Sequence, residues 1–326
     1  MKLAYWTKSK GIGGKIKDPE DFVVREIISK KFLRKYSVNG SIGRPKKYNL
    51  LLIRKRNITT RAAIKELARK LNIPEKAFGY AGLKDKFSIS FQYITVKSEK
   101  EIEKIDLGNV TIIETRKTDK FLSKGNLTGN EFEIILHGCK GGARKIITEI
   151  EKHGMPNFFG PQRFGKYQDN HIIGKLLLKR RFDEALRIIN SHDRKHRKIS
   201  DIPKDVLKFY IHAYQSWLFN AALSEYIRKE KKSYFKEVRI PGYRTNLKNN
   251  KIEAIMKKLL AKDGINPIDF MISELRMSVG GARRMAFIKV KIKYKHQKNK
   301  LNLYFTLPKG SYATTVMREI TKINGF

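Results

Sequence analysis

Apolar and polar residues alternate over several stretches of the chain, with the two-residue period of a half-buried β-strand. In FSISFQYITV (87–96) the odd-numbered residues Phe87, Ile89, Phe91 and Tyr93 alternate with Ser88, Ser90 and Gln92. In NEFEIIL (130–136) the residues Phe132, Ile134 and Leu136 share one face. We predict a strand in each stretch.

A third alternating stretch, AFIKVKIKYK (286–295), predicts a strand with one apolar face and one cationic face. The cationic face consists of Lys289, Lys291, Lys293 and Lys295. This lysine row either follows a phosphate backbone or protects an edge strand from aggregation, and the pattern favours neither interpretation.

The remaining periodicity is helical. After a predicted strand, YNLLLIRKR, Thr59 or Thr60 can cap a helix over TRAAIKELARKLNI, which Pro74 ends. Further helices are predicted over GARKIITEIEKHG, HIIGKLLLKRR, FDEALRIINS and VLKFYIHAYQSWLFNAALSEYIRK. The middle of the chain is thus helix-rich and both flanks are strand-rich. We expect the flanks to share one sheet, with residues 156–285 inserted into it.

The composition points to a polyanionic partner. Lys and Arg total 71 against 31 Asp and Glu, a formal net charge of +40. Nucleic acid is the strongest candidate, because cationic side chains gain affinity by releasing the counterions of phosphates. A Lys-rich surface of other origin would normally be rich in Glu as well.

The single cysteine, Cys139, excludes an internal disulfide and a cysteine-based zinc site, which fits a reducing cytoplasm. The chain has no apolar run of about 18 residues, so we expect no membrane association.

Common enzymatic signatures such as a P-loop, HExxH or GxSxG are absent from the sequence. The stretch YAGLKDK instead sets Asp85 between Lys84 and Lys86, in the loop entering a predicted strand. Nearby cations favour an ionised carboxylate, which a nucleophile or base requires. For an arbitrary loop aspartate, a turn residue or an ordinary surface ion pair is favoured by a wide margin, and the residues alone do not overturn that interpretation.

The aromatic segment NFFGPQRFG (157–165) contains Asn157, Phe158 and Arg163. Its rings, amide and guanidinium suit stacking on a base and contact with phosphate. A loop packed in the core is an equally good interpretation.

Six segments in this order resemble the motifs of the TruD family of tRNA pseudouridine synthases, from about residue 15 to the C-terminus. They are KDPEDFVVREI, YAGLKDKFSISFQ, GNEFEI, NFFGPQRFG, AYQSWLFN and FTLPKGSYATTVMREI. The resemblance implies an α+β fold: a pseudouridine synthase catalytic domain with a largely antiparallel mixed sheet, interrupted by a helix-rich TRUD insertion domain. We assign residues 1–155 and 286–326 to the catalytic domain and 156–285 to the insertion domain.

The resemblance also implies the chemistry. Members isomerise uridine in RNA without a cofactor or metal: the base is detached from C1′, turned and rejoined through C5. Asp85 matches the essential aspartate of the GLKD motif. It either attacks C1′ or removes the 2′ proton, and both routes stay open.

Other motif positions carry over individually to substrate binding. Phe22 and Glu26 match residues close to the catalytic centre, and Lys17 matches a basic residue that pairs with the aspartate. Asn130 would fix the catalytic loop and Phe132 would stack on the target base. The alternatives are a strand-edge cap for Asn130 and core packing for Phe22 and Phe132, and core packing is compatible with a functional role. The place of Phe132 on the apolar face of its predicted strand argues against stacking.

In NFFGPQRFG, the residues Asn157, Phe158 and Arg163 are assigned to substrate binding as well. The expected partner is therefore tRNA, held in a basic cleft and modified at position 13 of the D arm, as the family implies. No obligatory protein partner is evident. The alternative is a non-catalytic RNA-binding or RNA-chaperone protein; a methyltransferase would need a glycine-rich strand-to-helix turn, which we do not find.

Overall fold

The computed structural model describes residues 3–34, 47–192 and 195–323, which form two compact units. Unit 1 comprises Met1–Gly11, Arg144–Lys289 and Ser311–Phe326; unit 2 comprises Ile12–Ala143 and Val290–Gly310. Each unit thus joins segments that are far apart in the sequence. The domain boundaries expected from the sequence stay a prediction.

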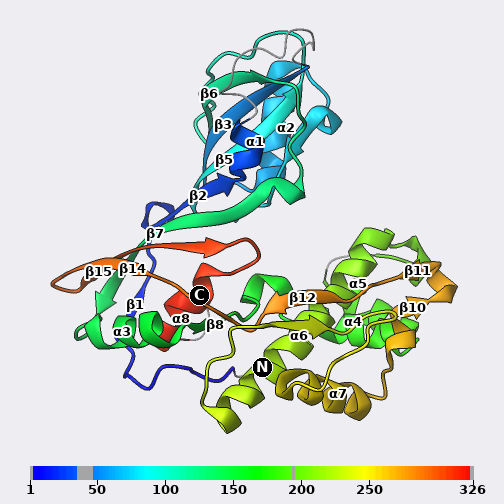
Figure 1. Ribbon diagram of the computed structural model, residues 1–326. Helices are drawn as coiled ribbons and strands as arrows, with labels where there is room; N and C mark the ends of the chain where they lie inside the picture. Colours follow the sequence, from blue (N-terminus) through cyan, green and yellow to red (C-terminus); the bar gives the residue numbers. More distant parts are fainter. Residues whose placement is uncertain (1–2, 35–46, 193–194, 324–326) are drawn as a thin grey trace. The chain divides into compact units, whose positions relative to one another are not determined.

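In the described part of the chain, unit 2 is built on a nine-stranded sheet with the order β14-β15-β7-β2-β5-β3-β6, to which β1 adds on β7 and β4 on β5 (Figure 1). All described strand pairs in it are antiparallel except β2 with β5. The strands are β1 (Gly13–Lys15), β2 (Phe22–Ile28), β3 (Tyr48–Arg56), β4 (Phe78–Tyr80), β5 (Ile89–Lys97), β6 (Val110–Thr118), β7 (Leu127–Cys139), β14 (Ile292–Gln297) and β15 (Lys300–Pro308).

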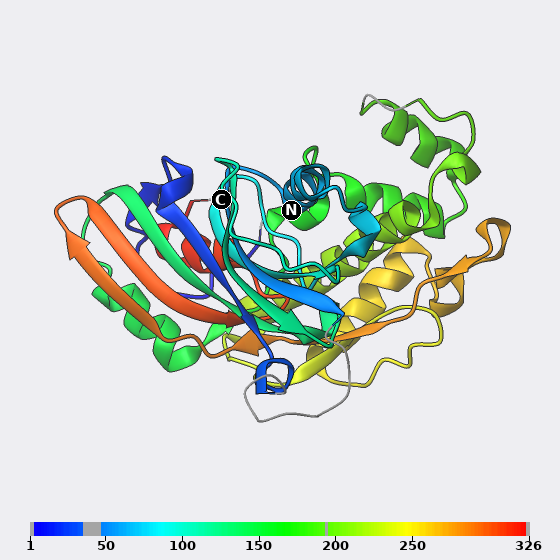
Figure 2. The same ribbon diagram turned by 90° about the horizontal axis from the view of Figure 1, so that it is seen from above.

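The two ends of the chain contribute to this one sheet, as the sequence pattern predicted. Strand β15 pairs with β7 over nine positions, from Lys300 opposite His137 to Pro308 opposite Gly129. Figure 2 shows the orange hairpin of β14 and β15 beside the green strand β7. A mixed α+β fold with a largely antiparallel sheet is thereby confirmed.

Helix α2 (Thr60–Leu71) packs on this sheet, and α1 (Lys30–Arg34) follows β2. The Thr59 side chain accepts a hydrogen bond from the Ala62 amide and caps α2, while Asn72 ends it in a left-handed conformation. Ile64 and Leu67 are buried in a core with residues of β3, β5 and β6. The cap of this helix was predicted correctly.

An alternating strand usually turns its apolar side toward the core. At the start of strand β5 the polar side is the buried one. Ser88, Ser90 and Gln92 are fully buried, whereas Phe87 is 51% exposed and Phe91 is half-buried. At this end of the strand the buried side is polar because the hydroxyl and amide groups of these residues bind one another and the loop that precedes the strand. Farther along, the same side is apolar, with Ile94 and Val96 fully buried.

Unit 1 is mostly helical, as predicted, and its core is organised around the long α6. Its helices are α3 (Arg144–His153), α4 (Asn170–Leu178), α5 (Phe182–Asn190), α6 (Lys204–Glu230), α7 (Lys251–Asp263) and α8 (Ala313–Thr321). Its short strands are β8 (Met155–Pro156), β9 (Glu237–Ile240), β10 (Met271–Ile272), β11 (Met277–Ser278), β12 (Ala282–Met285) and β13 (Phe287–Ile288). None of the described helices of either unit has the length and apolarity that crossing a membrane requires.

The predicted strand over residues 286–295 is wrong as a single element. It divides into β13, which pairs with β8 in unit 1, and β14, which lies at the edge of the sheet in unit 2. The residues between them, Lys289–Lys291, are not in a strand because the chain passes there from one unit to the other.

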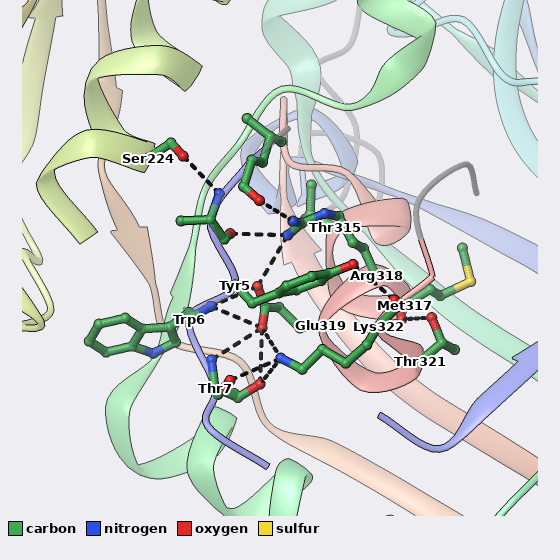
Figure 3. Close-up of polar contacts among 12 residues, drawn as sticks. Tyr5, Trp6, Thr7, Ser224, Thr315, Met317, Arg318, Glu319, Thr321 and Lys322 are labelled. Carbon is green, nitrogen blue, oxygen red and sulfur yellow. Dashed lines mark hydrogen bonds and ion pairs between the residues drawn. The ribbon is translucent and has the colours of Figure 1, made fainter. Parts of the chain in front are cut away.

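The N-terminal segment of unit 1 is held by α8 through a buried ionic cluster (Figure 3). Glu319 accepts hydrogen bonds from the amides of Trp6 and Thr7, and Arg318 donates to the carbonyls of Leu3 and Ala4. The arginine guanidinium also lies 3.9 Å from the centre of the Tyr5 ring. The two ends of the chain are thereby joined within unit 1.

Candidate active site

The loop between β4 and β5 carries Asp85, whose side chain is exposed. Buried polar side chains hold the main chain of this loop. Gln92 donates to the carbonyl of Gly82, and the Thr60 hydroxyl accepts from the Lys84 amide at 2.8 Å. Thr60 also donates to Gln92 at 3.0 Å, so the two side chains brace each other. The loop is therefore fixed from helix α2 and from strand β5.

Two further groups bind the carbonyl oxygen of Asp85 itself. The Nζ of Lys55 donates to it at 2.6 Å and also donates to the carbonyl of Ile58 at 2.7 Å. The hydroxyl of Ser88 donates to the Asp85 carbonyl at 3.2 Å. Burial lowers the pKa of Lys55 to about 8, an effect that the Asp85 carboxylate opposes and Lys84 reinforces.

Glu26 holds the same loop from strand β2. Its carboxylate lies 2.8 Å from the Nζ of Lys84, and both side chains are almost completely buried. The second carboxylate oxygen accepts from the amide of Tyr93 at 3.3 Å. Burial raises the pKa of Glu26, although the charge of Lys84 opposes this shift. The acid expected near the catalytic centre is thus bound to the residue that precedes Asp85.

An aromatic cluster lies on the same sheet face. Phe132 stacks on Phe305 with 5.4 Å between ring centres, and Phe22 meets it edge-on at 6.1 Å. Phe132 is buried, whereas Phe22 is half-buried and therefore more accessible. Asn130 is paired with Glu26 across the strands, and its buried Oδ1 has no hydrogen-bond partner among the described residues.

The strand register explains why these residues come together. Val24 lies opposite both Phe132 and Ser90, and Ser90 lies opposite Lys55. Residues opposite one another in a sheet project to the same face. We call this the loop face; it carries Phe22, Glu26, Lys55, Ser90, Gln92, Asn130 and Phe132.

Lys17 is exposed, and within the described residues it forms no ion pair with Asp85. Its main-chain amide instead donates to the carboxylate of Asp21, which also contacts His137 at 2.9 Å. Burial would raise the pKa of Asp21, but the hydrogen bonds from His137 and from the Lys17 and Asp18 amides hold it below its usual value. Pairing of Lys17 with Asp85 stays a prediction.

The remaining predicted residues lie in unit 1. The side chain of Asn157 donates to the carbonyl of Met285 and accepts from Arg284 and Ser311 at 2.8 and 2.9 Å. Phe158 is buried in the unit 1 core. Both side chains thus make their contacts within unit 1: Asn157 forms hydrogen bonds and Phe158 packs in the core. A role in substrate binding stays a prediction for them.

Arg163 and Arg284 surround the ring of Phe159. Their guanidinium carbons lie 5.8 and 3.9 Å from its centre, and Arg163 donates to the hydroxyl of Ser216 at 3.0 Å. Burial lowers the pKa of Arg284 to about 10 and shifts that of Arg163 in the same direction. The segment NFFGPQRFG therefore packs against two half-buried arginines, Arg163 of its own and Arg284.

Sequence reasoning missed three residues that organise these arrangements: Lys55, Thr60 as a loop ligand, and Arg284. Lys55 carries a detectable signal, because it follows Leu51 and Ile53 at two-residue spacing on the buried side of β3. Thr60 and Arg284 act across 24 and 127 residues of sequence, so no local pattern reveals them. No group of metal-ligating side chains occurs in the part of the chain that the structure describes.

Comparison with known proteins places the chain in a family. The family model described as tRNA pseudouridine synthase D (TruD) matches residues 2–200 and 227–320. A protein of Thermococcus sibiricus named "Probable tRNA pseudouridine synthase D" is 32% identical over 98% of this chain and 97% of its own length. The tRNA pseudouridine synthase D of Syntrophotalea carbinolica is 28% identical over 97% of this chain and 98% of its own.

The fold agrees with that comparison. A crystal structure of a protein from Methanosarcina mazei, described as "Putative tRNA pseudouridine synthase D (TruD)", aligns with a TM-score of 0.72, covering 98% of this chain and 96% of that one, at 24% identity. The match in fold and the match along the sequence therefore agree, and the chain belongs to the TruD family of tRNA pseudouridine synthases, which are isomerases.

Proposed function

We propose that this protein isomerises uridine to pseudouridine in tRNA, at position 13 of the D arm, with Asp85 as the catalytic carboxylate. The glycosidic bond from C1′ to N1 of the base is broken, the base turns, and C1′ bonds to C5; C5 loses its hydrogen as a proton, and N1 takes up a proton. The isomerisation needs no oxidant, reductant or group donor. Asp85 either attacks C1′ or removes the 2′ proton.

One observation carries this proposal: an exposed carboxylate projects from a loop whose main chain is bound at Gly82, Lys84 and Asp85 by buried side chains. A loop held in this way presents its acid in one place, and accurate placement of a reacting group contributes several kcal/mol to catalysis. An ordinary surface turn has no need of a buried lysine, glutamine and threonine beneath it.

The surroundings of the loop suit an extruded nucleotide. Turning a nucleotide out of its stack costs a few kcal/mol, which phosphate contacts and stacking on aromatic rings offset. The half-buried Phe22 supplies an accessible ring on the loop face, next to Phe132. The formal net charge of +40 supports binding of the tRNA backbone.

The test measures tritium release from tRNA labelled at C5 of uridine, together with mapping of pseudouridine before and after incubation. We expect the wild type to release tritium and to modify position 13, and a transcript with cytidine at that position to release none. Asp85→Asn should lower the rate by about 10²-fold or more, because a positioned acid or base contributes at least that factor. Its affinity for tRNA should stay unchanged, because one charge is lost among many.

The matched control is Asp119→Asn, which removes another exposed carboxylate of unit 2 and should retain the wild-type rate. Full activity of Asp85→Asn would reject the catalytic assignment. Tight binding of tRNA by the wild type with no tritium release would favour a non-catalytic RNA-binding protein. Modification at another uridine would reject the D-arm target alone.

A further inference from the structure

Lys55 is a charged residue on the buried side of β3, next to two apolar residues. It follows Leu51 and Ile53 on the loop face of β3, and all three are fully buried. Burying an ammonium group costs several kcal/mol unless other groups compensate, and apolar residues often serve a core better than buried ions do. A lysine at this position therefore needs a reason beyond packing.

The contacts of Lys55 show which groups surround its ammonium. Its Nζ donates to two main-chain carbonyls, those of Ile58 and Asp85, at 2.7 and 2.6 Å. Among the described residues it forms no ion pair within 4 Å. With the pKa lowered by burial to about 8, the ammonium form still dominates at neutral pH. The cation is thus held by carbonyl dipoles beneath the loop rather than by a partner carboxylate.

The other tethers of the loop act on different residues. Gln92 binds Gly82, while Thr60 and Glu26 bind Lys84. At Asp85, the described contacts are those of Lys55 and Ser88 with its carbonyl oxygen. Because the Asp85 carbonyl is one bond from its Cα, fixing this oxygen restricts where the Cα lies and thus where the side chain begins, while rotation about Cα–Cβ stays free.

We propose that Lys55 is the positioning residue of the Asp85 loop: its buried ammonium clamps the Asp85 carbonyl to β3 and so holds in place the backbone from which the carboxylate projects. Lys55 touches no substrate, and its catalytic effect rests on the proposed function of Asp85. Its second hydrogen bond, to Ile58 just before the cap of α2, joins the loop to the start of that helix.

The test compares Lys55→Met, which keeps the length and volume of the side chain but removes its donors and charge, with the wild type. Three quantities are measured: the single-turnover rate of pseudouridine formation with excess enzyme, the Kd for tRNA, and hydrogen–deuterium exchange of the peptide covering residues 82–90. We expect the rate to fall by about 10²-fold, the cost of a small misplacement of a reacting group. The Kd should be unchanged, and the peptide should exchange faster.

Arg56→Met is the matched control, because it removes one positive charge from the neighbouring, exposed position of the same strand. Its single-turnover rate and loop exchange should match those of the wild type. Lys55→Gln serves as a second variant if the methionine is not tolerated. The glutamine amide is neutral and one bond shorter, so we expect the same direction of change with a smaller amplitude.

A wild-type rate in a folded Lys55 variant, or unchanged exchange of the loop, would overturn the proposal. A rate loss matched by an equal loss of tRNA affinity would also overturn it, because the residue would then act on binding. The exchange measurement does not depend on activity. If the wild type makes no pseudouridine, the proposed function is rejected. The hydrogen exchange of residues 82–90 still tests whether Lys55 holds the loop.

Discussion

The buried ion pair between Glu26 and Lys84 makes a stability prediction that the structure quantifies. The two side chains are 2.8 Å apart and almost fully buried. Glu26→Ala would leave the ammonium of Lys84 in this environment without its carboxylate. Removing one partner of a buried pair typically costs about 3–5 kcal/mol, a large part of the about 5–15 kcal/mol that stabilises a domain. For a unit of this size the melting temperature should fall by about 6–20 °C.

The assay must report on unit 2. Both tryptophans, Trp6 and Trp217, belong to unit 1, so their fluorescence follows that unit. Unfolding of the sheet is better followed by hydrogen exchange of the peptide covering residues 82–97, measured at increasing urea concentration. We expect the variant to lose its protection in this peptide at lower urea concentrations than the wild type.

The double variant Glu26→Leu/Lys84→Met separates the pair from simple packing. Because it removes both charges, it should recover most of the stability lost in Glu26→Ala. In Lys84→Met alone, the pKa of Glu26 should rise further, since burial already raises it and Lys84 opposes that shift. The unfolding free energy of Lys84→Met should then fall as the pH rises above 4.5. A loss below about 1 kcal/mol in Glu26→Ala, as for an exposed pair, would refute the reasoning.

Two further predictions concern lysines. Burial lowers the pKa of Lys55 from 10.5 to about 8, so between these pH values the unfolded chain binds more protons than the folded one. The unfolding free energy of the wild type should therefore rise relative to that of Lys55→Met from pH 8 to 10.5. Urea midpoints of the two proteins that stay parallel across this range would contradict the prediction. Replacing Lys291, Lys293 and Lys295 by Gln should reduce the salt dependence of tRNA binding by about one unit of slope for each phosphate that these lysines neutralise. An unchanged slope would leave edge protection as the role of the two lysines on β14, which is an edge strand.

Local sequence patterns determined the elements whose formation depends on neighbours in the chain. The cap of α2, the alternation of β7 and helices α3 to α6 were predicted, because hydrogen bonds to nearby amides and the regular spacing of apolar side chains are local properties. Helices α7 and α8 were not predicted. The spacing from Asp85 to Gln92 was visible in the sequence as a motif. The hydrogen bond by which Gln92 holds the loop at Gly82 was not.

Tertiary structure alone decided which side of β5 is buried and what lies beneath Asp85. The polar side of that strand faces inward because Gln92 meets Gly82 and Thr60, and Thr60 is 32 residues away in the sequence. Lys55 meets the Asp85 carbonyl across 30 residues, and Glu26 meets Lys84 across 58. Periodicity cannot report such partners, because burial of a polar group becomes favourable when a distant segment supplies its hydrogen bonds, and that segment arrives when the sheet forms.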